Sequence, residues 1–362
     1  MKKLCFVSSN RADYYLLKNL MLRVIKSKKN NLQLIVTGSH LFKSYGMTIN
    51  NIIQDGFKIN KRIKLSSQTD KISIIDNISI GIKKFTLAYK KLNPDMVVLL
   101  GDRYEIFSSA IAAYFLNIPI AHIHGGELTL SSFDDVIRHN ITKMSKLHFA
   151  ANSIYKKRII QLGENPNSVF NVGSLGEENI KKLVFLKKEK LQKKIGFNFK
   201  EKNILITHHP ETLKFSKNEK NIKVILNTLN KLKNTGFIFT SPNNDTEGRI
   251  IKELIKKFVL KNKKKSILIN SMGSQAYLST MKYVDCVLGN SSSGIIEAPF
   301  LKVPTINIGD RQTGRVKAST VYDCSVNEVK ILNLIKKVFS DKFKRNYFIQ
   351  KKDYSSNTTS FR

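Results

Sequence analysis

The stretch from Asp95 to Gly126 reads "DMVVLLGDRYEIFSSAIAAYFLNIPIAHIHGG". Two short apolar runs, "MVVLL" and "IPIAHI", flank a longer segment with a helical pattern. A strand, a helix and a second strand in this order predict a βαβ unit with parallel strands. Proteins built from such units bind their ligands at the carboxyl ends of the strands.

The same alternation continues on both sides of this stretch. Towards the N-terminus, "KLCFVSS" precedes a helix expected from about Tyr14 to Lys28, and "LQLIVTGS" precedes a helical pattern over residues 40–56. Towards the C-terminus, "IPIAHIHGG" precedes a helix expected to begin near Asp134. Residues 1–172 are therefore predicted to form one Rossmann-like domain.

A second set of strand patterns follows "SVFNVGSLGEEN". These strands are expected in "NILITHHP", "TGFIFTSPNND", "KSILINSMG", "DCVLGNSSSG" and "VPTINIGDRQTG". A length of 362 residues suits two domains. Residues 173–362 are predicted to form a second Rossmann-like domain, with a hinge at Gly173 and Gly176. The expected architecture is two doubly wound α/β domains facing across a cleft.

The composition narrows the class of protein. The chain is 41% hydrophobic and 25% charged, which is ordinary for a globular protein. It has no apolar run of about 18 residues, and the run from Leu4 to Val7 is too short for a signal peptide. Three cysteines without metal-type spacing favour a reducing compartment. We therefore expect a cytoplasmic protein with no membrane partner.

The chain is strongly basic, with 62 Lys and Arg against 27 Asp and Glu and a net charge of +35. Such a charge raises the possibility of an RNA-binding protein, and strong salt-sensitive retention of RNA would favour that alternative. The lysines instead lie in helical surface patterns such as "KKLVFLKKEKLQKK", without an RNA-binding signature. We expect no nucleic-acid partner, although a positive field helps to attract an anionic substrate.

Acidic residues dominate one part of this basic chain. Between residues 95 and 135 there are six carboxylates and one basic residue, Arg103; the acids are Asp95, Asp102, Glu105, Glu127, Asp134 and Asp135. Neighbouring parallel strands would bring Asp102, His124 and Glu127 to one edge of the sheet. Carboxylates crowded at a partly shielded edge suit general acid and base chemistry. The segment predicts a proton-transfer site.

Two other interpretations of this segment remain open. Asp134 could simply cap a helix, with Asp135 in its first turn, and for Asp135 we favour this structural role. A metal site could form from His122, His124 and Glu127, because residues two apart on a strand share a face. The spacing matches no strong zinc pattern, so we expect no metal.

The second domain carries groups suited to phosphate. In "GNSSSGIIEAP", from Gly289 to Pro299, a small-residue turn opens a helix, where N–H groups and hydroxyls can bind an anion or the serine can serve only as a cap. "THHPET" supplies two imidazoles, expected to face the cleft, and "GDRQTGR" supplies two arginines. "SSNRADYY" places Arg11 just after the first strand. A diphosphate beside carboxylates predicts an enzyme acting on a nucleotide sugar.

Together these motifs resemble the hydrolysing UDP-N-acetylglucosamine 2-epimerases of the bacterial NeuC type. The resemblance covers nearly the whole chain, through "SSNRADYYLL", "LGDRYEIFS", "HIHGGELTLSSFDDVIRHNITKMSKLH", "VFNVGSLGEEN", "HHPETL" and "GNSSSGIIEAP…INIGDRQTGRV". It implies a GT-B-like fold and release of UDP and N-acetylmannosamine from UDP-N-acetylglucosamine, at the head of sialic acid synthesis. The related epimerase of UDP-2,4-diacetamido-2,4,6-trideoxyglucose, in legionaminic acid synthesis, remains an alternative. A glycosyltransferase shares the fold but would not need the carboxylates.

The resemblance also implies roles for single residues. The family's catalytic aspartates match Asp102 and Asp134. Where animal-type members have "HIEGGE" with a catalytic glutamate, this chain has His124, so either Glu127 or His124 fills the third catalytic role, and we favour Glu127. Implied substrate contacts are Arg11, Arg103, His209, Ser291, Ser292, Gly294, Glu297 and Arg311. The resemblance further implies a homodimer or homotetramer, and the elimination route demands no cofactor.

Overall fold

The computed structural model describes residues 1–68, 70–130, 132–211, 217–242, 247–341 and 343. The chain divides into two compact units. The N-terminal unit comprises residues 1–127 and 133–175, and the C-terminal unit comprises residues 128–132 and the chain from residue 176 onward. The functional boundary expected after residue 172 stays a prediction. No helix in the described ranges is both long enough and apolar enough to cross a membrane.

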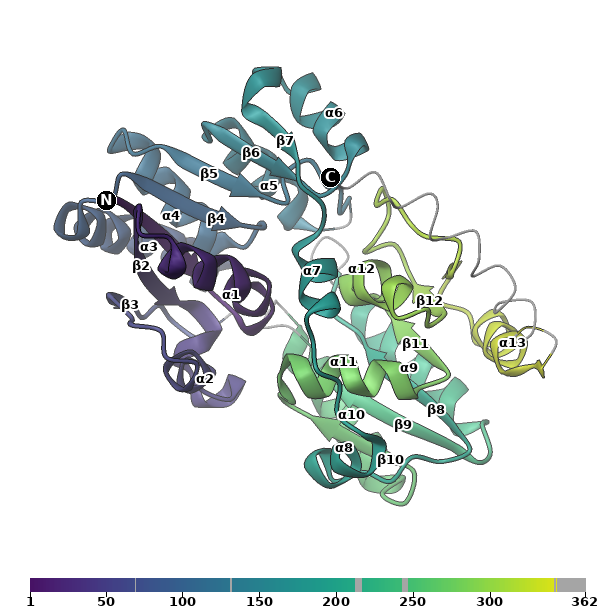
Figure 1. The fold of residues 1–362 in the computed structure, drawn as a ribbon. Coiled ribbons are helices and arrows are strands. Elements are labelled where there is room, and N and C mark those ends of the chain that lie inside the picture. The colour runs from purple at the N-terminus through teal and green to yellow at the C-terminus, as the bar shows by residue number, and fades with distance from the viewer. Residues whose placement is uncertain (69, 131, 212–216, 243–246, 342, 344–362) are drawn as a thin grey trace. The chain divides into compact units, whose positions relative to one another are not determined.

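The N-terminal unit is built on a parallel sheet with the strand order β3-β2-β1-β4-β5-β6-β7 (Figure 1). Its strands are β1 (Lys2–Ser8), β2 (Asn30–Thr37), β3 (Lys61–Ile63), β4 (Met96–Leu100), β5 (Ile120–Ile123), β6 (Leu147–Ala150) and β7 (Val169–Asn171). Its helices are α1 (Arg11–Lys26), α2 (Ile49–Gln54), α3 (Lys71–Leu92), α4 (Tyr104–Phe115), α5 (Phe133–Lys143) and α6 (Ser153–Gln161). The strand order changes direction between β1 and β4, which is the switch point of the sheet.

Both faces of this sheet are buried, as the strand β4 shows. Val97 and Leu99 pack into one apolar cluster, and Val98 and Leu100 pack into another on the opposite face. Side chains alternate between the faces of a strand, so a continuous apolar run such as "MVVLL" suits a strand with helices on both sides.

The C-terminal unit has the same construction, with the order β10-β9-β8-β11-β12-β13 and every pairing parallel. Its strands are β8 (Lys202–Thr207), β9 (Thr235–Thr240), β10 (Ser266–Ile269), β11 (Cys286–Gly289), β12 (Thr305–Ile308) and β13 (Val321–Cys324). Its helices are α8 (Lys188–Ile195), α9 (Asn218–Asn230), α10 (Gly248–Lys261), α11 (Gly273–Tyr283), α12 (Ser292–Phe300) and α13 (Glu328–Phe339). The helix α7 (Leu175–Lys181) begins at the division between the units. The switch point of this sheet lies between β8 and β11.

The predicted class of two doubly wound α/β domains is confirmed, with two local corrections. The helix α1 begins at Arg11, one turn earlier than expected, because Asn10 and Asp13 form a capping box. The prediction of a helix over residues 40–56 is mostly wrong. Short 3-10 turns come first, and the α-helix is confined to α2. Gly46 and Met47 have positive φ values of 88° and 45°, which interrupt a continuous helix here.

Candidate active site

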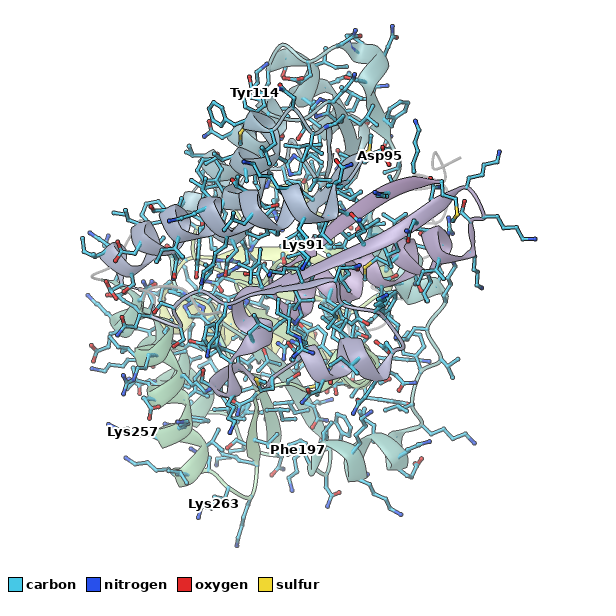
Figure 2. All side chains as sticks on the ribbon, turned by 90° about the vertical axis from the view of Figure 1, so that its left-hand side faces the viewer. Lys91, Asp95, Tyr114, Phe197, Lys257 and Lys263 are labelled. Atoms are coloured by element: carbon cyan, nitrogen blue, oxygen red, sulfur yellow. The ribbon has the colours of Figure 1, made fainter. Side chains whose placement is uncertain are left out.

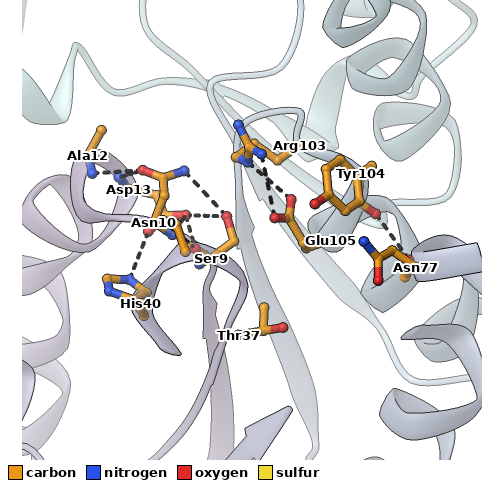
Figure 3. Close-up of polar contacts among 12 residues, drawn as sticks. Ser9, Asn10, Ala12, Asp13, Thr37, His40, Asn77, Arg103, Tyr104 and Glu105 are labelled. Carbon is orange, nitrogen blue, oxygen red and sulfur yellow. Dashed lines mark hydrogen bonds and ion pairs between the residues drawn. The ribbon is translucent and has the colours of Figure 1, made fainter. Parts of the chain in front are cut away.

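In the N-terminal unit, the predicted residues Arg11, Asp102 and Arg103 follow β1 and β4, the two strands at the switch point. The loops that follow adjacent parallel strands at this point form the crevice in which doubly wound proteins bind their ligands. Figure 3 shows this edge of the sheet, with the loop after β1 opposite Arg103 and Glu105. The sequence therefore placed these three residues where the topology favours a site.

A buried network fixes the loop that carries Arg11. The carboxylate of Asp13 accepts hydrogen bonds from the hydroxyl groups of Ser8 and Ser9, and from the backbone N–H of Asn10 at 3.0 Å. The Ser8 hydroxyl also contacts Nε2 of His40 at 2.9 Å (Figure 3 labels His40). This network holds Arg11 at the first position of α1.

Glu105 orients the guanidinium group of Arg103. Nε of Arg103 lies 3.0 Å from Oε2 of Glu105, a carboxylate that is only 1% exposed. Arg103 itself stays partly exposed, with 14% of its side chain accessible. The sequence singled out Arg103 but missed the role of Glu105, which stands two residues later in the same motif.

Arg138 joins the two stretches that carry the predicted carboxylates. Its side chain is 1% exposed, pairs through Nη2 with Asp102, and donates from Nη1 to the backbone oxygen of Glu127 at 2.8 Å. Arg138 thus links the side chain of Asp102 to the backbone of Glu127, and the catalytic role of the Glu127 carboxylate stays a prediction. The sequence analysis missed Arg138, although its place four residues after Asp134 on a helix puts both residues on one face.

The loop after β5 contains two residues with a left-handed backbone conformation. Positive φ values occur at His124 (64°) and Gly126 (78°), whereas Gly125 has none. A Cβ on Gly126 would lie 2.5 Å from the backbone oxygen of Tyr155, so a side chain is excluded here on two grounds.

This conformation turns His124 towards Glu127. Nε2 of His124 accepts a hydrogen bond from the backbone N–H of Leu175 at 3.4 Å, which leaves the proton on Nδ1. Nδ1 lies 3.5 Å from Oε1 of Glu127, and both side chains are buried. The two candidates for the third catalytic role are thus neighbours that contact each other.

The alternative metal site rests on a wrong premise. His124 lies beyond the end of β5, so His122 and His124 do not share a strand face. Nε2 of His122 donates to the backbone oxygen of Gly101 at 2.9 Å, and burial lowers the pKa of His122 to about 4. Within the described residues, no group of three or more His, Cys, Asp or Glu side chains is arranged to hold a metal ion. His122 has a structural role.

Asp134 and Asp135 both lie in the first turn of α5. The interpretation of Asp134 as the helix cap is wrong, because the helix begins one residue earlier, at Phe133. Asp135 contacts Arg138 at 3.7 Å and His139 at 3.8 Å, which agrees with a structural role for Asp135. Asp134 is half-buried on the same helix as Arg138.

In the C-terminal unit, one buried asparagine ties together three predicted loops. Oδ1 of Asn290 accepts from the backbone N–H of His209 at 2.6 Å, and its Nδ2 donates to the backbone oxygen of His209 at 2.8 Å. The backbone oxygen of Asn290 accepts from Arg311 at 3.2 Å and from Gln312 at 2.8 Å. The loops after β8, β11 and β12 therefore meet at one sheet edge.

The serine-rich turn opens α12 at the switch point of this sheet. Ser291 is the helix cap, and its hydroxyl accepts from the backbone N–H of Ser293. Ser292 begins the helix and is partly exposed, and Glu297 follows later on the same helix. Gly294 lies close to β12, where an added Cβ would meet the side chain of Thr305 at 2.7 Å. The capping role of Ser291 is observed, and it is compatible with an anion at the helix start.

The two imidazoles of "THHPET" differ. His209 is fixed through its backbone by Asn290, as described above. His208 is 1% exposed, its ring nitrogens have no hydrogen-bond partner among the described residues, and its pKa is lowered to about 4, first by burial and then by Arg311. His208 is therefore buried and neutral. Its burial does not support the expectation that it faces a ligand.

A family profile for UDP-N-acetylglucosamine 2-epimerases matches residues 23–362. The chain belongs to the UDP-N-acetylglucosamine 2-epimerase family. It is 45% identical over 346 residues to a GDP/UDP-N,N'-diacetylbacillosamine 2-epimerase (hydrolyzing) of Campylobacter jejuni, covering 95% of this chain and 89% of that relative. It is 43% identical over 345 residues to the polysialic acid biosynthesis protein P7 of Escherichia coli, covering 95% and 88%. Its activity is that of a hydrolysing UDP-sugar 2-epimerase.

Solved structures share the fold of this family member. A UDP-GlcNAc 2-epimerase from Neisseria meningitidis bound to UDP-GlcNAc has a TM-score of 0.79 at 20% identity, covering 96% of this chain and 93% of that one. Staphylococcus aureus MnaA in complex with UDP has a TM-score of 0.78 at 20% identity, covering 94% and 89%. These likenesses confirm the GT-B-like fold class.

Proposed function

We propose that the protein converts UDP-N-acetylglucosamine and water to UDP and N-acetylmannosamine. The reaction has two stages, an elimination that gives 2-acetamidoglucal and a hydration of that intermediate. The observation that carries the proposal is the cluster of Asp102, Arg138 and Glu127 at the switch point of the N-terminal sheet. In this cluster Arg138 binds the carboxylate of Asp102 and the backbone oxygen of Glu127, which supports a role for Asp102 as the base that deprotonates a sugar carbon.

In the elimination, a carboxylate removes the proton from C2 of the sugar. The electrons of that C–H bond form the C1–C2 double bond, and the C1–O bond breaks so that UDP leaves with its electron pair. A C2–H bond is a weak acid, so the reaction needs a fixed base and strong stabilisation of the leaving diphosphate. Asp102 is suited to the role of this fixed base, because Arg138 holds one of its carboxylate oxygens.

The diphosphate is assigned to donors from the loops at the switch point of the C-terminal sheet. In the C-terminal unit these are His209, Arg311, the N–H groups that open α12, and the Ser291 and Ser292 hydroxyls. In the N-terminal unit, Arg11 and Arg103 are proposed as further substrate contacts. Arginine forms paired, charge-assisted hydrogen bonds with phosphate oxygens. Glu297 is assigned to the ribose hydroxyls, which need an acceptor.

In the hydration, a hydroxyl group adds to C1 and a proton adds to C2 from the face opposite to the one that lost it. One group must therefore deliver a proton while another accepts one from water. We assign these tasks to Glu127 and Asp134. The Nδ1 proton of His124 faces Glu127. This suits a histidine that orients the Glu127 carboxylate and returns a proton to it. We further propose a cytoplasmic enzyme, in keeping with its three buried free cysteines.

A second candidate substrate is UDP-2,4-diacetamido-2,4,6-trideoxyglucose, the UDP form of N,N'-diacetylbacillosamine. It is favoured by the names of the Campylobacter jejuni relative and of a Legionella pneumophila relative that is 32% identical over 333 residues. The chemistry at C1 and C2 is the same for both sugars. They differ at C4, where an acetamido group replaces a hydroxyl, and at C6, where a methyl group replaces the hydroxymethyl group.

A competition assay separates the two substrates. The purified protein is given equal amounts of both UDP-sugars, and the free sugars are followed over time by NMR. The proposal predicts that N-acetylmannosamine forms faster, with one UDP released per sugar. Faster release of the diacetamido sugar would replace the first candidate with the second, and release of neither sugar would contradict the proposal for both.

A further inference from the structure

The C-terminal unit contains a buried carboxylate, Glu211, to which the proposed mechanism gives no role. Glu211 follows β8 in the motif "HHPET", and its exposed fraction is 3%. A carboxylate is costly to bury unless it accepts hydrogen bonds. Oε1 of Glu211 accepts one from the backbone N–H of Asp310, in the loop after β12, at 3.1 Å. The side chain therefore ties together the loops of two strands that flank β11 in the sheet.

The backbone that carries Glu211 is fixed by two buried asparagines. The backbone N–H of Glu211 donates to Oδ1 of Asn218 at 2.9 Å, and Nδ2 of Asn218 donates to the backbone oxygen of Glu211 at 3.3 Å. Asn218 is buried and begins α9. Two residues before Glu211, Asn290 holds the backbone of His209 in the same way. The Glu211 side chain therefore projects from a fixed backbone, as it must if it is to fix another loop.

The loop after β12 is shaped to receive this carboxylate. Gly309 has a φ of 80°, and a Cβ added to it would lie 2.5 Å from Oε1 of Glu211. A side chain at this position is therefore excluded both by the backbone conformation and by the close contact. The loop then turns tightly, because the backbone N–H of Thr313 donates to the backbone oxygen of Asp310 at 2.9 Å. Arg311 occupies the first central position of this turn.

Glu211 thus holds the residue immediately before Arg311, and Nη1 of Arg311 donates to the backbone oxygen of Asn290 at 3.2 Å. We propose that Glu211 is a positioning residue, whose carboxylate fixes the turn that presents Arg311 to the diphosphate of the substrate. This inference rests on the proposed function, which assigns Arg311 to the diphosphate. Glu211 does not itself bind the substrate, because it is buried and its negative charge would repel a phosphate group.

The affinity for UDP, measured by isothermal titration calorimetry, tests this role. Glu211→Ala removes the acceptor, so the affinity should fall roughly tenfold. Glu211→Gln keeps an oxygen that accepts from the same N–H and should stay within about threefold of the wild type. Glu211→Asp keeps the charge but withdraws the carboxylate by one methylene group, so it should behave like Glu211→Ala. The control is Glu253→Ala, at an exposed position on α10, the helix on which Figure 2 labels Lys257, and it should leave the affinity unchanged.

A double substitution separates positioning from a general loss of structure. Because Glu211 acts through Arg311, Glu211→Ala should cost no further UDP affinity in a protein that already carries Arg311→Ala. Circular dichroism establishes that each variant is folded, and Glu211→Asp replaces Glu211→Ala in this cycle if the alanine variant does not fold. Additive losses in the double variant, or wild-type affinity in Glu211→Ala, overturn the inference and leave the proposed function standing. A wild-type protein that does not bind UDP overturns both.

Discussion

At the scale of single residues, Arg138 connects the candidate catalytic groups. It contacts Asp102 and the backbone of Glu127 from a position that is 1% exposed. Arg138→Lys keeps the charge, but a lysine cannot span both contacts with a planar fork. We expect turnover to fall at least about a hundredfold and the free energy of unfolding to fall by roughly 1–3 kcal/mol.

Steady-state kinetics and urea unfolding measure these two effects. Arg62→Lys, at an exposed position on β3, is the matched control and should change neither quantity. A fully active Arg138→Lys enzyme would show that the arginine is only a structural contact.

Glu127 and His124 can be distinguished although they contact each other. Glu127→Gln keeps an acceptor for the Nδ1 proton of His124 but cannot take up a proton, so turnover should fall about 10²–10⁴-fold. His124→Asn should cost less, because the histidine orients the carboxylate. The kcat values of the two variants show which substitution costs more turnover. If Glu127→Gln is nearly fully active while His124→Asn is inactive, the histidine carries the third catalytic role.

At the scale of elements, the turn after β5 depends on Gly126. Gly126→Ala combines a positive φ of 78° with a clash against the backbone of Tyr155, so we expect a loss of about 2–4 kcal/mol in unfolding free energy. Gly56 is the matched control, since it has a φ of 82° and open space around its missing Cβ. Gly56→Ala should cost only about 1 kcal/mol. Equal losses in urea unfolding would contradict the close packing inferred for this turn.

The strands could be predicted because their apolar runs are short, rich in β-branched residues and bounded by turns. Asp102 and the serine-rich turn could be placed because they directly follow such strands. The helix α3 could not be recognised from its sequence pattern. Its exposed face also carries isoleucine and leucine, so its apolar residues do not mark one face at helical spacing. Arg138, Glu105 and Asn290 were missed because their roles depend on contacts between loops that only the folded chain brings together.

At the scale of the whole molecule, each unit contains one buried histidine whose pKa is lowered to about 4, His122 and His208. An imidazole in the unfolded chain takes up a proton below pH 6.5, and the folded one resists it until about pH 4. Their contribution to stability is therefore complete above pH 6.5 and is lost as the pH falls from 6.5 towards 4.

His208→Leu tests this linkage in the C-terminal unit. The leucine does not titrate, and its neighbours lose no hydrogen bond, because the ring nitrogens of His208 have no partner among the described residues. Between pH 7 and pH 5 the wild-type protein should lose about 2 kcal/mol more unfolding free energy than the variant. Urea unfolding at both pH values measures the difference. Parallel losses in the two proteins would show that His208 does not resist protonation in the folded state.

The net charge of +35 also acts on the whole molecule, because a positive field attracts a nucleotide sugar that carries two phosphate groups. The central claim, however, concerns the carbon that the carboxylates deprotonate. Turnover of UDP-N-acetylglucosamine in heavy water, with the product followed by proton NMR, tests it most directly. We expect N-acetylmannosamine with one deuterium at C2 and a stoichiometric amount of UDP. A released sugar that keeps its original hydrogen at C2 would contradict proton removal at that carbon and, with it, the assigned roles of Asp102, Glu127 and Asp134.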